Sequence, residues 1–300
     1  MRNPFGAVAI GAAVLLAAAC SASPTAAPAP PSAPEPLTAA AALGDFASID
    51  YCSLLDPARL PDATAAAPDS SFTDCRVDLV QAGHQVAVTV GPLAADRDPN
   101  VRPYNYPGRV PDGVAVQQSG FAPDQACVRV ITFADGIRLP VSVTGGEPEA
   151  RCTGADAVVG GALAALGGGR ARHVQFPDRS WGRVDSCALL ETHDLDAASG
   201  AGTKASPGLA GHSCIRGKVS VDFAVVKQAP TGPSETLGGR TARITTDGAF
   251  CRARVVQPSP ATAGRAEQAT VSVVDTTGEG GDAACATVRT AAAPVFAKIP

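Results

Sequence analysis

The sequence predicts an α+β chain of two tandem, disulfide-stapled domains, each an antiparallel sheet with an opening and a closing helix. Three observations predict this fold. Four cysteines of the first half recur in the same order in the second half, segments of period-two alternation follow them, and a helix-like segment closes each half. We place the first domain at residues 47–169, a linker at 170–183 and the second domain at 184–300.

The N-terminal segment has the pattern of a bacterial export signal. Arg2 gives it a positive start, and residues 5–16 form an apolar stretch too short to span a bilayer comfortably. The following run VLLAAAC resembles the lipobox, in which a cysteine is joined to diacylglycerol and becomes the new N-terminus, although Ala17 stands where a branched residue is usual. We expect a signal peptide at 1–19 and lipidation of Cys20. Ordinary cleavage after an Ala-x-Ala site is the alternative.

The number of cysteines fits an exported, lipidated protein, and the net charge limits the classes of partner. The chain has nine cysteines, an odd number, and thiols pair in an oxidising compartment, so lipid on Cys20 leaves eight for disulfides. The formal net charge of −4 argues against a nucleic-acid partner. We assign residues 20–46 to the lipidated cysteine and a Pro/Ala/Ser-rich tether, and we expect the protein on the outer face of the cell membrane.

The two halves open with the same pattern. Residues 49–56 read IDYCSLLD and residues 184–191 read VDSCALLE, an aliphatic-Asp-x-Cys-x-Leu-Leu-acid signature. The leucine pairs suit a short opening helix, and Asp50 and Asp185 stand where helix N-caps belong. Two copies of this signature, each followed by the same cysteine order, indicate an internal repeat.

Alternating segments then predict the strands of both sheets. Residues 85–90 and 219–225 alternate with period two and are rich in valine, as half-buried strands are. Residues 128–133 and 137–143 flank Asp135-Gly136 and predict a β-hairpin. Its counterpart in the second half comprises residues 252–257 and 269–274, with a longer connection.

The last element of each half is predicted to be a helix. Residues 156–166 fit a helix that ends at the glycine run 167–169. Residues 283–296 fit a second helix, and Pro294 is expected to stop it near its end.

Four cysteines in one half allow three pairings, and both halves should share one answer. We expect the first to pair with the second and the third with the fourth. Metal binding and redox catalysis need closely spaced motifs such as Cys-x-x-Cys, which the sequence lacks, so we expect no metal and no cofactor. The expected pairs are Cys52–Cys75, Cys127–Cys152, Cys187–Cys214 and Cys251–Cys285.

These features resemble an uncharacterised family of actinobacterial cell-envelope lipoproteins. The lipobox, the Pro/Ala spacer and the Cys-x-Leu-Leu opening with four spaced cysteines carry the resemblance. The same layout is similar to the extracellular sensor domain of mycobacterial receptor serine/threonine kinases, which also has two disulfides. The tandem arrangement departs from such proteins. Relatives also often have a tryptophan beside the second cysteine, whereas here Phe72 and His212 stand nearby. The resemblance implies a fold and a location but no reaction.

One segment breaks the symmetry between the halves. The second and third cysteines are 52 residues apart in the first half and 37 in the second, and the excess lies around residues 96–109. Tyrosine and arginine dominate recognition surfaces, and prolines lower the ordering cost of binding. This segment is therefore a candidate binding loop, or else a surface excursion that covers a sheet edge. Its candidate residues are Arg97, Arg102, Tyr104, Tyr106 and Arg109.

The single tryptophan, Trp181, lies in the linker, where packing between the two domains is the expected role and ligand contact the second. The cluster around His193 is expected to be a solvated helix end. The sequence shows no catalytic signature such as Gly-x-Ser-x-Gly, a phosphate loop or a dinucleotide fingerprint.

We therefore expect a non-enzymatic, membrane-anchored binding or interaction module of the cell envelope. Its partners would be the membrane, through the N-terminal lipid, and an envelope protein or small ligand. Two alternatives stay open. One is an envelope enzyme or enzyme inhibitor whose site forms only in three dimensions, and the other is an extracytoplasmic sensor-like domain.

Overall fold

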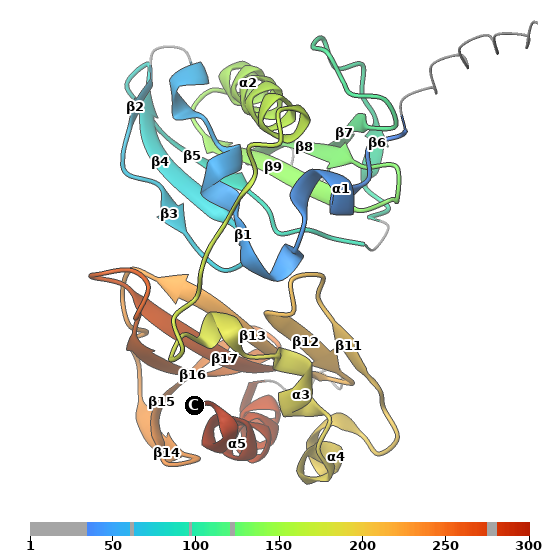
Figure 1. Cartoon of the computed structure of the whole chain (residues 1–300). Helices are drawn as coiled ribbons and strands as arrows, with labels where there is room; N and C mark the ends of the chain where they lie inside the picture. The colour runs from blue at the N-terminus through green and yellow to red at the C-terminus, as the bar shows by residue number, and fades with distance from the viewer. Residues whose placement is uncertain (1–34, 61–62, 96–97, 121–123, 275–280) are drawn as a thin grey trace, which may run out of the picture. The chain divides into compact units, whose positions relative to one another are not determined.

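Two antiparallel β-sheets, each with one long α-helix against one face, make up most of the described chain (Figure 1). The predicted signal peptide and Cys20 lie outside the described residues. The computed structural model describes residues 35–60, 63–95, 98–120, 124–274 and 281–300.

The two sheets have the same strand order from one edge to the other. The strands of the first sheet, in spatial order, are β2 (Ala63–Ala65), β4 (Cys75–Gln81), β5 (His84–Val90), β9 (Arg138–Gly145), β8 (Ala126–Thr132), β7 (Ala115–Ser119) and β6 (Val101–Pro103), with β3 (Asp69–Ser70) also paired to β4. Those of the second are β11 (Ala205–Pro207), β12 (Ser213–Arg216), β13 (Val219–Val226), β17 (Ala266–Val274), β16 (Phe250–Pro258), β15 (Arg240–Asp247) and β14 (Ser234–Leu237). The predicted strands and the predicted hairpin are all among them.

Helix α2 (Pro148–Gly167) packs against β8 and β9, and helix α5 (Gly281–Lys298) packs against β14 to β17. Strand alternation decides which side chains meet each helix. In β16, Cys251, Ala253 and Val255 are buried, whereas Arg252 and Arg254 project from the opposite, open face and are only half-buried. Each sheet therefore has a helix-covered face and an open face.

Both long helices extend beyond the predicted limits. Helix α2 begins at Pro148 rather than at residue 156. Proline suits this position because it lacks an N–H, and the first N–H of a helix has no intrahelical acceptor in any case. Pro294 lies inside α5, which continues to Lys298, so the prediction that it ends the helix is wrong. An interior proline costs about 3 kcal/mol. Complete burial of Val295 and Phe296, at about 2 kcal/mol each, offsets that cost.

The four disulfides join the cysteines in the predicted pairs. In each half the first disulfide connects the opening segment to the second strand of the sheet order, β4 or β12. The second connects β8 to α2 in the first half and β16 to α5 in the second. Equivalent elements are thus tied at equivalent places.

The opening segments are short and capped as predicted. In the first half a 3-10 helix spans Tyr51–Leu54, and the Asp50 carboxylate accepts a hydrogen bond from the Cys52 N–H. In the second half α3 (Ser186–Leu190) is capped in the same way by Asp185, and α4 (Asp196–Ser199) follows it. The first opening helix is a single 3-10 turn rather than an α-helix.

The folded part begins inside the range assigned to the tether. Helix α1 (Ala39–Leu43) falls within residues 20–46, and Ala39 and Leu43 are fully buried in the first hydrophobic core. The Ala39 N–H donates to Asp135 of the β8–β9 turn at 3.0 Å. The segment from residue 37 onward therefore belongs to the fold.

The predicted linker at 170–183 is ordered along most of its length. Its strand β10 (Arg172–His173) pairs with β1 (Ile49–Asp50). Farther along, the fully buried Glu267 of β17 accepts hydrogen bonds from Ser180 Oγ and the Trp181 N–H, both at 2.7 Å. These bonds satisfy a buried carboxylate and hold the end of the linker against the second sheet.

Residues 35–300 form one compact unit. Several contacts join residues of the first half to residues of the second. Asp69 forms ion pairs with Lys227 and Arg265, and Ser71 Oγ accepts a hydrogen bond from the Val225 N–H. Phe72 is buried with the second hydrophobic core.

Candidate functional site

The candidate binding loop is fastened to helix α2 by its two tyrosines. The Tyr104 hydroxyl donates to Oδ2 of Asp156 at 2.7 Å, and the Tyr106 hydroxyl donates to the main-chain oxygen of the same residue at 3.2 Å. Burial first, and then the Asp156 carboxylate, raise the pKa of both tyrosines above the ordinary value. Both hydroxyls therefore stay protonated and act as donors at neutral pH.

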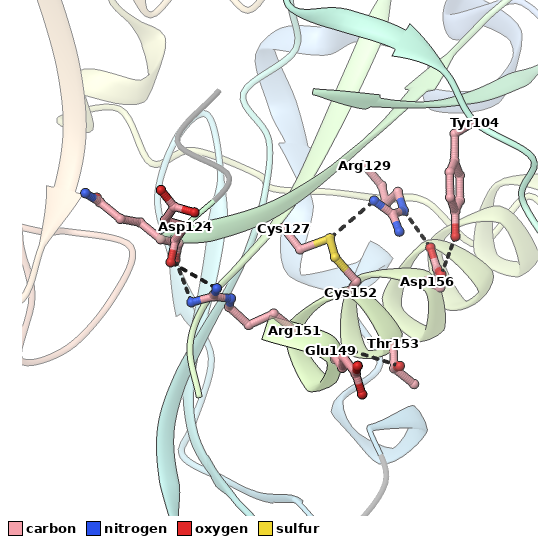
Figure 2. Close-up of a disulfide and its surroundings, with 10 residues drawn as sticks. Tyr104, Asp124, Cys127, Arg129, Glu149, Arg151, Cys152, Thr153 and Asp156 are labelled. Carbon is pink, nitrogen blue, oxygen red and sulfur yellow. Dashed lines mark hydrogen bonds and ion pairs between the residues drawn. A yellow bond between two sulfur atoms is a disulfide. The ribbon is translucent and has the colours of Figure 1, made fainter. Parts of the chain in front are cut away.

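Arg129 of β8 completes this anchor (Figure 2). Its Nε lies 2.7 Å from Oδ1 of Asp156, its guanidinium lies 3.8 Å from the centre of the Tyr104 ring, and its side chain is only 6% exposed. It also donates to the sulfur of Cys127, which is bonded to Cys152. We call Tyr104, Arg129 and Asp156 the loop anchor. It joins the loop, the sheet and the helix at one point.

A groove lies between the anchored loop and α2. It has a volume of about 500 Å³, and we call it the loop groove. Gly160, Leu163 and Ala164 of α2 line it with small or apolar side chains, while Arg59 and Arg109 contribute two cationic groups. The remaining lining residues are Tyr106, Gly108, Pro111 and Gly167.

Charge and shape in the loop groove favour an amphiphilic ligand. Arg109 is exposed, and no ion pair within the described residues neutralises it, whereas Arg59 contacts Asp56 at 3.4 Å in an exposed pair. A Cβ at Gly160 would lie 3.0 Å from the Tyr106 hydroxyl, so a larger residue there would displace the tyrosine. Apolar pockets with a few placed polar groups are typical of small-molecule sites.

The other candidate residues lie elsewhere. Arg102 is exposed on the edge strand β6 and donates to the main-chain oxygens of Pro99 and Val101, and Arg97 lies outside the described residues. Because β6 pairs with β7 at the end of the sheet, the loop also covers a sheet edge, which was the alternative role.

Trp181 is completely buried in the second hydrophobic core. Its ring packs 6.1 Å from that of Phe223, and its Nε1 donates to the main-chain oxygen of Pro300. It therefore anchors the linker to the second half, in a buried cluster that also includes Phe72 of the first half. A fully buried ring also offers no surface to a ligand.

Asp156 and Arg129 are not among the residues predicted from the sequence, although the sequence carries a signal for them. Arg129 stands two residues after the third cysteine and Asp156 four residues after the fourth. The corresponding residues of the second half are Ala253 and Arg289, which cannot form the same pair. The half with the longer loop is thus the half with the anchoring pair.

A second pocket, of about 380 Å³, is lined by residues of both halves and by His212. The Nε2 of His212 lies 2.8 Å from the main-chain oxygen of Ala47, so this nitrogen carries the proton, because a carbonyl only accepts. Its Nδ1 is buried and has no partner among the described residues. Burial lowers the pKa of His212 below its ordinary value of 6.5, and the contact with Ala47 partly opposes this.

His193 is exposed and contacts Asp196 at 3.2 Å, as a solvated helix end would. Among the described residues, no group of three or more His, Cys, Asp or Glu is arranged to hold a metal ion.

Comparisons with protein-family models, curated proteins and solved structures found no significant match.

Asp156→Ala should destabilise the protein by about 3 kcal/mol, because it leaves the buried Arg129 guanidinium without its counter-charge. Tyr104→Phe, which removes one hydrogen bond, should cost only about 1 kcal/mol. Urea unfolding followed by circular dichroism measures both. The double variant Arg129→Met/Asp156→Ala should recover most of the loss, since neither charge then remains buried alone. Equal effects of the two single variants would contradict the loop anchor.

His212 should make the protein less stable as the pH falls below 6.5. The pKa of its folded form lies below that of the unfolded form, so the unfolded chain binds more protons in this range and acid favours unfolding. The loss should reach at most about 1.4 kcal/mol per pH unit. The comparison is urea unfolding at pH 7.5 and pH 5.5 for wild type and His212→Gln. A variant with the same pH dependence as wild type would exclude His212 as the cause.

Proposed function

We propose that this chain is a lipid-anchored lipoprotein of the cell envelope that binds a small amphiphilic anion in the loop groove. One observation carries the proposal. The loop anchor and the Tyr106 hydrogen bond hold the extra chain of the first half against α2, so that Tyr106, Arg109 and an apolar part of α2 line one cavity of about 500 Å³.

The lining residues support binding without catalysis. The described residues that line the groove include no Ser, Cys, His, Asp or Glu that could act as a nucleophile or a general base. The Tyr106 hydroxyl is engaged with α2, and its raised pKa keeps it protonated at neutral pH, so it does not serve as a base. An apolar floor and arginines suit a ligand with a hydrocarbon body and a carboxylate or similar group.

The two halves, we propose further, are tandem copies of one α+β domain. Their equal strand order, their equivalent disulfides and the shared opening signature support duplication. The resemblance to actinobacterial cell-envelope lipoproteins and to a kinase sensor domain belongs to this proposal, and it rests on the sequence motifs alone.

The lipid anchor is proposed for Cys20. Eight cysteines are paired with one another in four disulfides, so a lipid thioether would account for the ninth. None of the helices in the described ranges is long and apolar enough to cross a membrane.

Replacement of Cys20 should release the protein from the membrane. Wild type should sediment with membranes and carry the mass of a diacylglycerol-modified N-terminus, whereas Cys20→Ala should lack that mass and appear in the soluble or secreted fraction. Immunoblots of the fractions and intact-mass spectra measure the two effects. A Cys20→Ala protein that still sediments with membranes would exclude this lipid as the anchor.

Ala164→Phe should block the loop groove. Ala164 is an exposed lining residue of α2, so a phenyl ring there fills the cavity without entering the core. We expect dansyl-labelled undecanoate, an amphiphilic carboxylate, to bind the variant at least tenfold more weakly than wild type in a fluorescence titration.

Ala297→Phe is the matched control for this experiment. Ala164 and Ala297 each follow the fourth cysteine of their half by twelve residues, and both are exposed. The control should bind the probe as wild type does. Wild type that fails to bind the probe, or equal weakening by the two substitutions, would contradict the proposed ligand class.

A further inference from the structure

The open face of the second sheet carries a cluster of arginines. Arg243 lies on β15, and Arg252 and Arg254 lie on β16; all three are half-buried and alternate with residues that face α5. Arg243 and Arg254 are direct cross-strand partners in the sheet register. Like charges directly opposite each other destabilise a sheet, so this pair needs a compensating partner.

The hydrogen-bond acceptors of this pair are neutral. Arg243 donates to the main-chain oxygen of Gly232 at 2.9 Å, and Arg254 donates to Thr245 Oγ1 at 2.7 Å. Burial, followed by repulsion from Arg252, lowers the pKa of Arg254 below its ordinary value, and the nearby Asp247 carboxylate partly opposes this shift. Arg252 has its own acidic partner, Asp247, at 3.1 Å. The charges of Arg243 and Arg254 therefore lack an ion pair among the described residues.

A pocket of about 370 Å³ lies at this pair. Arg243 and Arg254 line it from the open face of the sheet. Arg240 also contributes to the lining, but its side chain alternates to the α5 face, where the guanidinium donates to the main-chain oxygens of Phe296 and Pro300. No acidic residue of the described chain lines the pocket. The other lining residues are Ala229, Pro230, Thr241, Val255 and Val256.

The fold does not require arginine at these places. Arg254 stands three residues after the third cysteine of its half, and Val130 stands three residues after the third cysteine of the first half. The cross-strand partner of Val130 is Gln117, as that of Arg254 is Arg243. The first sheet thus forms with uncharged residues at both positions.

We infer that Arg243 and Arg254 form a site for a phosphate group, distinct from the loop groove. A tetrahedral oxyanion offers several acceptor oxygens, which match the planar donor fork of arginine and neutralise the opposed charges. The phosphate can belong to a soluble compound or to a phospholipid headgroup, and both present the same oxygens to the site.

The test uses the full-length Cys20→Ala chain, so that an N-terminal lipid does not contribute to membrane binding. Calorimetric titration with inorganic pyrophosphate should show binding to this chain. Arg243→Gln/Arg254→Val, which introduces the residues of the first sheet, should weaken it at least tenfold. Arg243→Lys/Arg254→Lys should bind with intermediate affinity, because it keeps the charge but loses the planar fork.

Arg76→Gln/Arg138→Gln is the matched control. It removes the same charge from the open face of the first sheet and should bind pyrophosphate within twofold of the parent chain. Absence of binding to the parent chain, or equal weakening by the control, would overturn the proposal. Intact-mass detection of four disulfides and a near-ultraviolet circular dichroism spectrum verify each fold. If Arg243→Gln/Arg254→Val is misfolded, the single variant Arg254→Gln should still weaken pyrophosphate binding.

Sedimentation with vesicles separates the two sources of phosphate. If phosphatidylglycerol vesicles, but not phosphatidylcholine vesicles, retain the parent chain and lose Arg243→Gln/Arg254→Val, the ligand is a lipid headgroup. If pyrophosphate binds and neither vesicle does, the ligand is a soluble phosphate. None of the residues replaced in these variants lines the loop groove. The phosphate-site proposal and the amphiphilic-ligand proposal can therefore fail separately.

Discussion

The disulfide between Cys127 and Cys152 joins β8 to the first turns of α2, and the features that distinguish the first half depend on this link. Cys152 and Asp156 are four residues apart on one helix, so they lie on the same side, and Arg129 lies two residues from Cys127 on the same face of the strand. Fixing the two cysteines therefore brings the carboxylate to the guanidinium. The Asp156 carboxylate of that ion pair then accepts a hydrogen bond from Tyr104, which holds the loop against the helix.

The disulfides matter because the cores are built largely from small side chains. Helix α2 buries mostly alanine, glycine and valine, which remove less apolar area from water than leucine or phenylalanine would. Each disulfide restricts the unfolded chain, a contribution on the order of 3 kcal/mol for loops of this length. In the second half, Cys251–Cys285 gives the same support to α5. A chain with few aromatic residues thereby keeps two long helices in fixed register with their sheets.

The two halves share the same strand order and differ in the face of the sheet from which arginine side chains project. Arg129 follows the third cysteine by two residues and points, like that cysteine, toward the helix, where an acid and a tyrosine receive it. In the second half, Arg252 and Arg254 follow the third cysteine, Cys251, by one and three residues, so their side chains point away from α5. A shift of one position moves the charge from a structural role in the interior to a surface where a ligand can reach it.

The sequence by itself predicted the capped opening turns and six of the strands, because capping and periodicity are local signals; these strands are β5, β8, β9, β13, β16 and β17. The repeated order of the cysteines indicated that both halves share one pairing, but the structure selects that pairing from the three possible ones. Only the tertiary structure decided the start of α2, the passage of α5 through Pro294 and the burial of Trp181. It also decided that Asp156 receives Tyr104 and that Arg243 opposes Arg254. These outcomes depend on packing and strand register between residues distant in sequence, and the free energy of those contacts overrides what the neighbouring residues favour.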